Sequence, residues 1–98
     1  RVHEDIEDYI LAIVGATRED PSLSLGASPR AAQALIRAAR ARALIQGRDF
    51  VTPDDVASVT LPALAHRLVP AWSANGGEAT RTATEILEAI LQRVEPPR

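Results

Sequence analysis

The residues of this 98-residue sequence that are best placed for chemistry lie together at one expected helix start. Ser28 can serve as an N-cap by accepting a hydrogen bond from a free backbone amide, and Pro29 suits the first helical position because its missing N–H has no helical partner there. Arg30 and Ala31 follow on the first turn, where unpaired amides attract anions. A guanidinium at this place can bind a phosphate through two parallel hydrogen bonds. The local pattern alone also fits an ordinary capped helix with a solvated arginine.

Other groups of reactive side chains have a simpler explanation. The acidic pairs Glu4-Asp5, Glu7-Asp8 and Asp54-Asp55 could work as paired carboxylates, but all three lie at expected helix starts, where the helix dipole favours negative charge. The sequence has no cysteine, P-loop, Ser–His–Asp spacing or His-x-x-x-His zinc pattern. We expect His66 to be a packing or surface histidine and Arg67 a surface charge. No catalytic residue, no metal site and no enzymatic activity are therefore expected of this chain by itself.

The length predicts one small domain, and the absence of a membrane-spanning run and of a signal peptide predicts a cytoplasmic protein. The chain is long enough for one modest core, which is expected to span residues 1–98. No apolar run is long enough to cross a bilayer, and no signal-peptide pattern opens the chain. All basic residues are arginine, and the net charge is −2, which does not suit a general nucleic-acid binder. The abrupt start and end of the sequence indicate a segment of a larger protein.

Periodicity and capping signals predict the elements that position these residues. Apolar residues repeat at helical spacing from Ile6 to Val14 and predict a helix over 5–18, followed by a loop over 21–27. The Ser28-Pro29 start predicts a second helix over 29–46, with Gly47 as its stop.

The second helix is expected to be central. Its core face consists of small and aliphatic residues: Ala32, Leu35, Ile36, Ala39 and Ala43. Arg30 and Arg37 fall almost opposite. That side also carries apolar residues and is not purely polar, since it includes Ala34, Ala41, Leu44 and Ile45.

The second half of the chain contains two more helix starts. Thr52 followed by Pro53 and two acids predicts a helix over 53–61, with Phe50 or Val51 as a hydrophobic staple. Pro62 either breaks this helix or opens a short turn that reaches Leu68. A capping box beginning at Thr82 predicts the last helix over 82–94, after a loop over 70–81 whose Trp72 covers the core. No strand signal is strong, and we expect an all-α bundle of four to five helices.

Several motifs in this order resemble a known family. They are Asp8-Tyr9-Ile10, Leu25-Gly26-Ala27-Ser28-Pro29-Arg30, Ala38-Ala39-Arg40-Ala41, Gly47-Arg48-Asp49-Phe50-Val51-Thr52-Pro53-Asp54-Asp55-Val56 and His66-Arg67-Leu68. Together they closely resemble the C-terminal helical lid of MoxR-type AAA+ ATPases, over roughly residues 2–94. The second and fourth blocks at this separation are specific, whereas either block alone is weaker.

The resemblance implies a function for Arg30. In that family the lid packs over ATP and Mg held by a preceding P-loop domain of the same chain, and the arginine that corresponds to Arg30 is the sensor-2 residue, which reaches the phosphates. Ser28, Pro29 and Ala31 would then form the helix start near the nucleotide. The Walker A, Walker B, sensor-1 and arginine-finger elements belong to the large domain, so this chain alone is not expected to bind ATP tightly.

The resemblance also implies partners. The family forms rings, commonly hexamers, in which neighbouring subunits meet. Its members act in chaperone-like maturation or assembly of other proteins, often with partners that carry von Willebrand factor A domains. Neither a membrane span nor nucleic acid is part of this expectation.

A helical protein-binding or DNA-binding module without a nucleotide role is the alternative. The Thr52-Pro53-Asp54-Asp55 helix start also occurs in histone-like folds, and arginines along the second helix could form a basic recognition surface: Arg30, Arg37, Arg40, Arg42 and Arg48. The acidic net charge and the absence of lysine argue against DNA binding.

Overall fold

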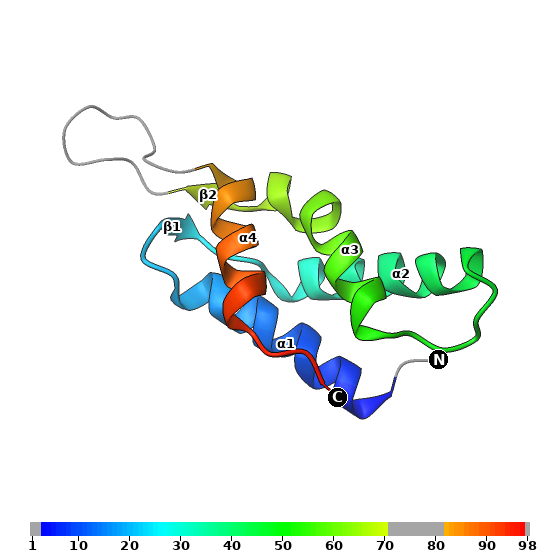
Figure 1. Cartoon of the computed structure of the whole chain (residues 1–98). Coiled ribbons are helices and arrows are strands. Elements are labelled where there is room, and N and C mark those ends of the chain that lie inside the picture. Colours follow the sequence, from blue (N-terminus) through cyan, green and yellow to red (C-terminus); the bar gives the residue numbers. More distant parts are fainter. Residues whose placement is uncertain (1–2, 71–81, 98) are drawn as a thin grey trace.

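A computed structural model describes residues 3–70 and 82–97 of the chain. Its helices are α1 (Glu4–Glu19), α2 (Pro29–Ile45), α3 (Pro53–Leu64), the short 3₁₀ helix η1 (Ala65–Arg67) and α4 (Ala83–Arg93), and its strands are β1 (Leu23–Leu25) and β2 (Val69–Pro70). Figure 1 shows α2 and α3 as a hairpin, with α1 and α4 packed against it. The predicted all-α class is confirmed. The predicted loop over 70–81 lies outside the described residues from position 71 onward, and Trp72 lies in that part.

The helices begin and end close to their predicted bounds because the predicted caps form. The Ser28 hydroxyl accepts a hydrogen bond from the Ala31 N–H at 3.2 Å, and both Thr52 and Thr82 take part in complete capping boxes. Gly47 ends α2 with a φ of +79°, a conformation that suits glycine. Hydrogen bonds from Gly47 N–H to the Leu44 carbonyl and from Arg48 N–H to the Ala43 carbonyl, both 2.9 Å, close the helix end.

The predicted end of α3 at residue 61 is wrong by three residues. The helix continues through Pro62 to Leu64 and is followed directly by η1. A proline inside a helix removes one N–H donor and crowds the carbonyl four residues earlier, and burial on either side of Pro62 offsets that cost. Thr60 and Leu64 are both fully buried, and the Thr60 hydroxyl donates to the Val56 carbonyl at 2.7 Å. Tertiary packing thus overrides the local stop signal.

A small antiparallel ribbon replaces part of the expected loop over 21–27. Strand β1 pairs with β2, placing Leu23 opposite Pro70 and Leu25 opposite Val69, with an irregularity between the two pairs. The expectation that no strand would form is therefore corrected. Three and two residues are too few to show a strand periodicity, and the pairing depends on segments far apart in the sequence.

The core is built from aliphatic side chains and from alanines that let helices approach closely. On α2 the predicted core face is confirmed: Ala32, Leu35, Ala39 and Ala43 are buried and Ile36 is half-buried. Val51 is the buried member of the proposed staple, whereas Phe50 is 51% exposed. The opposite side of α2 has two exposed apolar residues near its end, Leu44 and Ile45.

Candidate functional site

The loop before α2 lies against the end of α1 at a distance that only glycine permits. A Cβ atom on Gly26 would lie 2.7 Å from both the Arg18 Cα and the Thr17 carbonyl oxygen. Ala27 follows and is 1% exposed, and its N–H donates to the Thr17 hydroxyl at 2.9 Å. The Thr17 hydroxyl in turn donates to the Val14 carbonyl at 2.6 Å. These contacts fix the point at which α2 begins.

A second contact from α1 supports the same loop. The Nε atom of Arg18 donates to the Ala27 carbonyl at 2.8 Å, so both polar groups of the Ala27 backbone are held by α1. The sequence reasoning selected neither Thr17 nor Arg18, because their partner lies nine or ten residues along the chain. The Gly-Ala pair before the cap was the available signal, since a glycine followed by a small residue fits a close backbone approach.

The predicted site residues meet at the start of α2, but they face different environments. Ser28, Pro29 and Arg30 are exposed, with Ser28 at the N-cap and Pro29 at the first helical position. Ala31 is 1% exposed, and its N–H is already bound by Ser28. Arg30 makes no hydrogen bond or ion pair within residues 3–70 and 82–97. Arg30 thus has no competing partner among those residues, and it follows a positively polarised helix start that favours an anion.

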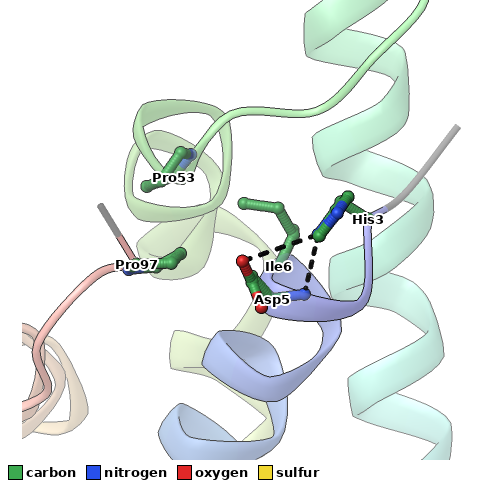
Figure 2. A pocket seen from close by; sticks show the side chains of 5 residues that line it. All are labelled: His3, Asp5, Ile6, Pro53 and Pro97. Atoms are coloured by element: carbon green, nitrogen blue, oxygen red, sulfur yellow. Dashed lines mark hydrogen bonds and ion pairs between the residues drawn. The ribbon is translucent and has the colours of Figure 1, made fainter.

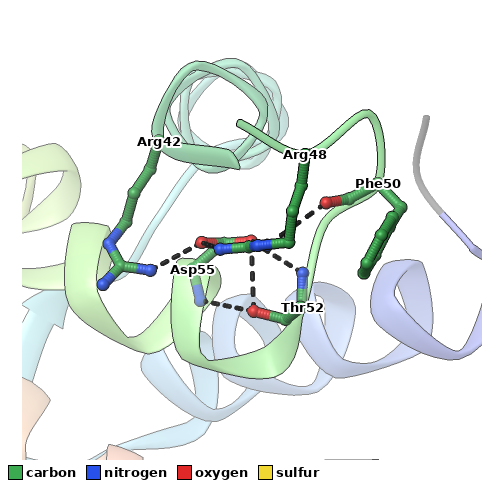
Figure 3. A network of polar contacts seen from close by, with 5 residues as sticks. All are labelled: Arg42, Arg48, Phe50, Thr52 and Asp55. Carbon is green, nitrogen blue, oxygen red and sulfur yellow. Dashed lines mark hydrogen bonds and ion pairs between the residues drawn. The ribbon is translucent and has the colours of Figure 1, made fainter. Parts of the chain in front are cut away.

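A different charged cluster lies at the other end of α2, as Figure 3 shows. The side chain of Asp55 is fully buried, and both of its oxygens are bound by Arg48, at 2.6 and 2.8 Å. Arg42 donates to Oδ1 at 2.5 Å. The backbone N–H of Thr52 donates to Oδ2 at 2.8 Å, and the Thr52 hydroxyl also lies within hydrogen-bond distance of it. This Asp55 cluster joins the end of α2 to the start of α3.

The electrostatics of the Asp55 cluster show that it is structural. The paired guanidinium of Arg48 holds the pKa of Asp55 far below its usual range, although burial acts in the opposite direction. The same hydrogen bonds raise the pKa of Arg48. Asp55 is therefore ionised at neutral pH and has no spare capacity for proton transfer. The prediction that its acidic pair serves helix capping is confirmed for Asp55, which completes the capping box of α3.

The Asp55 cluster also bears on the DNA-binding alternative. Of the arginines considered for a basic surface, Arg42 and Arg48 are bound to a buried carboxylate, with 32% and 25% of their side chains exposed. Arg30, Arg37 and Arg40 remain exposed. The sequence reasoning treated Asp55 only as part of a helix start, because nothing local marks its two arginine partners.

The remaining candidate residues form no further reactive centre in the part of the chain that is described. His66 and Arg67 are exposed on η1, and the Arg67 Nε donates to the Ala63 carbonyl at 3.1 Å. Among residues 3–70 and 82–97, no three histidine or acidic side chains are arranged to hold a metal ion. No helix within those ranges has the length and apolar character needed to cross a membrane.

The same helical bundle is found in a protein of known structure. A crystal structure from Cytophaga hutchinsonii, of a protein described as a "putative ATPase", matches this fold with a TM-score of 0.87 and 33% sequence identity. The match covers 99% of this chain and 32% of that one. The class is thus a small helical domain that forms part of a longer protein.

Sequence relatives place the chain within that class. The family model of the AAA lid domain matches residues 15–90, and the chain belongs to this family. It is 40% identical over 97 residues to the uncharacterized protein YeaC of Bacillus subtilis, covering 97% of this chain and 30% of that protein. It is 38% identical over 106 residues to the chaperone MoxR1 of Mycobacterium tuberculosis, covering 99% and 28%. The chain is a lid of the MoxR type and spans less than a third of the length of these relatives.

Proposed function

We propose that this chain is the lid of a larger MoxR-like AAA+ ATPase and that Arg30 is its sensor-2 residue. In this proposal residues 1–98 form one lid domain, which closes over ATP held by a preceding P-loop domain of the same protein. The observation that carries the proposal is the state of Arg30, which is exposed at a rigidly placed helix start and has no partner in the described structure. The AAA lid family match and the length of the relatives support it.

The proposed role follows from the charge of the reaction. Negative charge on the phosphoryl oxygens redistributes during transfer of the γ-phosphoryl group, and a positioned arginine stabilises the transition state. Ser28 and Pro29 hold the first turn of α2 so that Arg30 presents its guanidinium from a fixed backbone position. Because Arg30 and the P-loop lie on different domains, the nucleotide state can control how the two domains are oriented.

The proposal extends to cofactors and partners of the whole protein. ATP and Mg bind in the P-loop domain, and this chain alone neither holds them tightly nor catalyses hydrolysis. The whole protein forms a ring, commonly a hexamer in this family, and acts in protein maturation or complex assembly. The Mycobacterium tuberculosis relative is named a chaperone, which supports that role. A partner with a von Willebrand factor A domain is part of the same family-based proposal.

The experiment is the substitution Arg30→Ala in the longer protein that contains this chain. We expect ATP turnover to fall by roughly 10- to 1,000-fold, at or below the lower end of the roughly 10³- to 10⁵-fold contribution of arginine fingers to phosphoryl transfer. Arg37→Ala is the matched control, because Arg37 is an exposed arginine on the same helix about 10 Å further along. It should leave turnover nearly unchanged. If both variants keep wild-type turnover and nucleotide affinity, Arg30 is a surface arginine and the sensor-2 assignment is wrong.

A further inference from the structure

Helix α1 contacts different parts of the bundle at its two ends. Its first turn is capped by His3, whose Nδ1 atom accepts a hydrogen bond from the Asp5 N–H at 3.1 Å, and it borders a hollow that Pro53 of α3 also lines (Figure 2). Its last turn carries Thr17, which contacts the loop before α2. Because α1 has buried residues from Ile6 to Thr17, it is packed into the core along its length. Its last turn is therefore a fixed reference for the start of α2.

The Thr17 side chain makes the hydrogen bond that sets where α2 begins. It is fully buried, and its hydroxyl donates to the Val14 carbonyl at 2.6 Å. That bond uses the one proton of the hydroxyl, so the oxygen serves the Ala27 N–H as an acceptor, at 2.9 Å. A buried N–H without an acceptor is costly. Ala27 is therefore restricted to a narrow range of positions relative to α1.

Little freedom remains between Ala27 and Arg30. The Ala27 carbonyl accepts a hydrogen bond from the Arg18 Nε at 2.8 Å, so α1 binds both polar groups of this residue. Ser28 caps the helix, and the ring of Pro29 fixes its φ. The side chain of Arg30 makes no hydrogen bond or ion pair of its own within residues 3–70 and 82–97. The place from which Arg30 extends is thus set by its neighbours and, through Ala27, by α1.

We propose that Thr17 is a positioning residue for Arg30, and that its hydroxyl transmits the orientation of α1 to the start of α2. This inference rests on the proposed function, in which the P-loop domain precedes α1 and Arg30 reaches the phosphates of ATP. Because Thr17 is fully buried, it acts through another residue and not by contact with ATP. A displacement of about 1 Å in a group that assists the reaction can change the rate about 100-fold. The loss of one buried hydroxyl is therefore expected to affect turnover as well as stability.

Thr60 provides a matched control within the chain. It is also fully buried, and its hydroxyl donates to the Val56 carbonyl at 2.7 Å, as Thr17 does to Val14. In the described parts of the chain, however, no N–H of another element donates to the Thr60 hydroxyl. Removing this hydroxyl therefore perturbs the core of α3 without releasing the start of α2.

The first experiment compares two substitutions of Thr17 in the longer protein that contains this chain. Thr17→Val keeps the shape and removes the hydroxyl, and we expect it to lower kcat for ATP hydrolysis roughly 3- to 30-fold with little change in KM. Thr17→Ser keeps the hydroxyl and loses a methyl group, and it should retain turnover within about twofold of wild type. Both variants should lower the melting temperature of the 98-residue chain by about 3–8 °C. Thr60→Val should lower the melting temperature in the same way and leave turnover unchanged.

A double-mutant cycle then shows whether Thr17 acts through Arg30. When Arg30 has been replaced by alanine, Thr17→Val should lower turnover by less than about a further twofold. Arg18→Ala removes the other contact to Ala27 from an exposed side chain, so it tests the inference even if Thr17→Val does not fold. We expect Arg18→Ala to lower turnover roughly 2- to 10-fold, and only while Arg30 is present.

The outcomes separate this inference from the proposed function. Wild-type turnover of Arg30→Ala would overturn the proposed function, and this inference with it. If Arg30→Ala lowers turnover but neither Thr17→Val nor Arg18→Ala does, only the positioning role is wrong. The same conclusion follows if Thr60→Val slows turnover as much as Thr17→Val, if Thr17→Ser is as slow as Thr17→Val, or if the effects of Thr17→Val and Arg30→Ala multiply. In each of these cases Thr17 stabilises the lid without positioning Arg30.

Discussion

The two ends of α2 carry the same kind of side chain in opposite states. At the C-terminal end, Arg42 and Arg48 both bind the buried carboxylate of Asp55. At the N-terminal end, Arg30 is exposed and has no compensating group in the described structure. The comparison teaches that position near a helix end does not define the role of an arginine here. The presence or absence of a buried partner does.

The strongest test of this comparison removes the carboxylate. Asp55→Ala leaves two partly buried arginines and the Thr52 N–H without their acceptor. We expect a loss of about 3 kcal/mol in the free energy of unfolding, at the lower end for a broken buried pair because both arginines are partly solvated. Urea unfolding followed by circular dichroism measures it. A loss below about 1 kcal/mol would show that the cluster is not the main interaction that holds α2 against α3.

A second test addresses the support beneath Arg30. Gly26→Ala places a methyl group 2.7 Å from backbone atoms of Thr17 and Arg18, which cannot move away easily. We expect a loss of about 1–3 kcal/mol in the free energy of unfolding. Gly15→Ala is the matched control, since its methyl would meet nothing within 4 Å inside α1. That variant should gain about 0.5–1 kcal/mol through helix propensity. Equal effects of the two variants would contradict the close approach.

A third test uses pH to separate the two ends. Because Arg48 lowers the pKa of Asp55 in the folded state, folding favours the ionised carboxylate. Its stabilising contribution is complete above the unfolded pKa of about 3.9 and is lost as the pH falls from there toward the folded pKa. The difference in melting temperature between wild type and Asp55→Asn should therefore be constant from about pH 5 to 7 and shrink below about pH 4. A constant difference down to pH 2 would contradict the assignment.

The smallest expected effect is at Arg30. Arg30→Ala removes an exposed side chain without a partner in the described structure, so the melting temperature of the chain should change by less than about 3 °C. Differential scanning calorimetry measures this shift, with Arg48→Ala as the contrasting variant that should lower the melting temperature clearly. If Arg30→Ala destabilises the chain as much as Arg48→Ala, the two ends of α2 do not differ in the way described.

Local signals predicted most of the fold. The helix ends were predicted from residues that act within one turn of the chain, and the observed helices begin or end at these residues: Ser28, Thr52, Thr82 and Gly47. The extension of α3 past Pro62 and the β1–β2 ribbon were not predictable in the same way. Both depend on packing or pairing with segments remote in the sequence.

The candidate site shows the same division. The cap and the first turn that carry Arg30 could be read from consecutive residues, whereas the support from Thr17 and Arg18 could not. Likewise, Asp55 was recognised as a capping residue, but its arginine partners seven and thirteen residues away were not. Contacts within one turn of a helix can be predicted from the spacing of residues, whereas contacts between helices can be predicted only when the fold is known.

The β1–β2 ribbon has a mechanical consequence. It joins the segment just before α2 to the segment just after η1, while the Asp55 cluster joins the other end of α2 to α3. The helix is thus tied near both of its ends to the α3–η1 segment, and it is about 25 Å long for its 17 residues. Because the two connections lie at opposite ends of this length, a rotation of α2 as a rigid body is expected to move α3 and η1 with it.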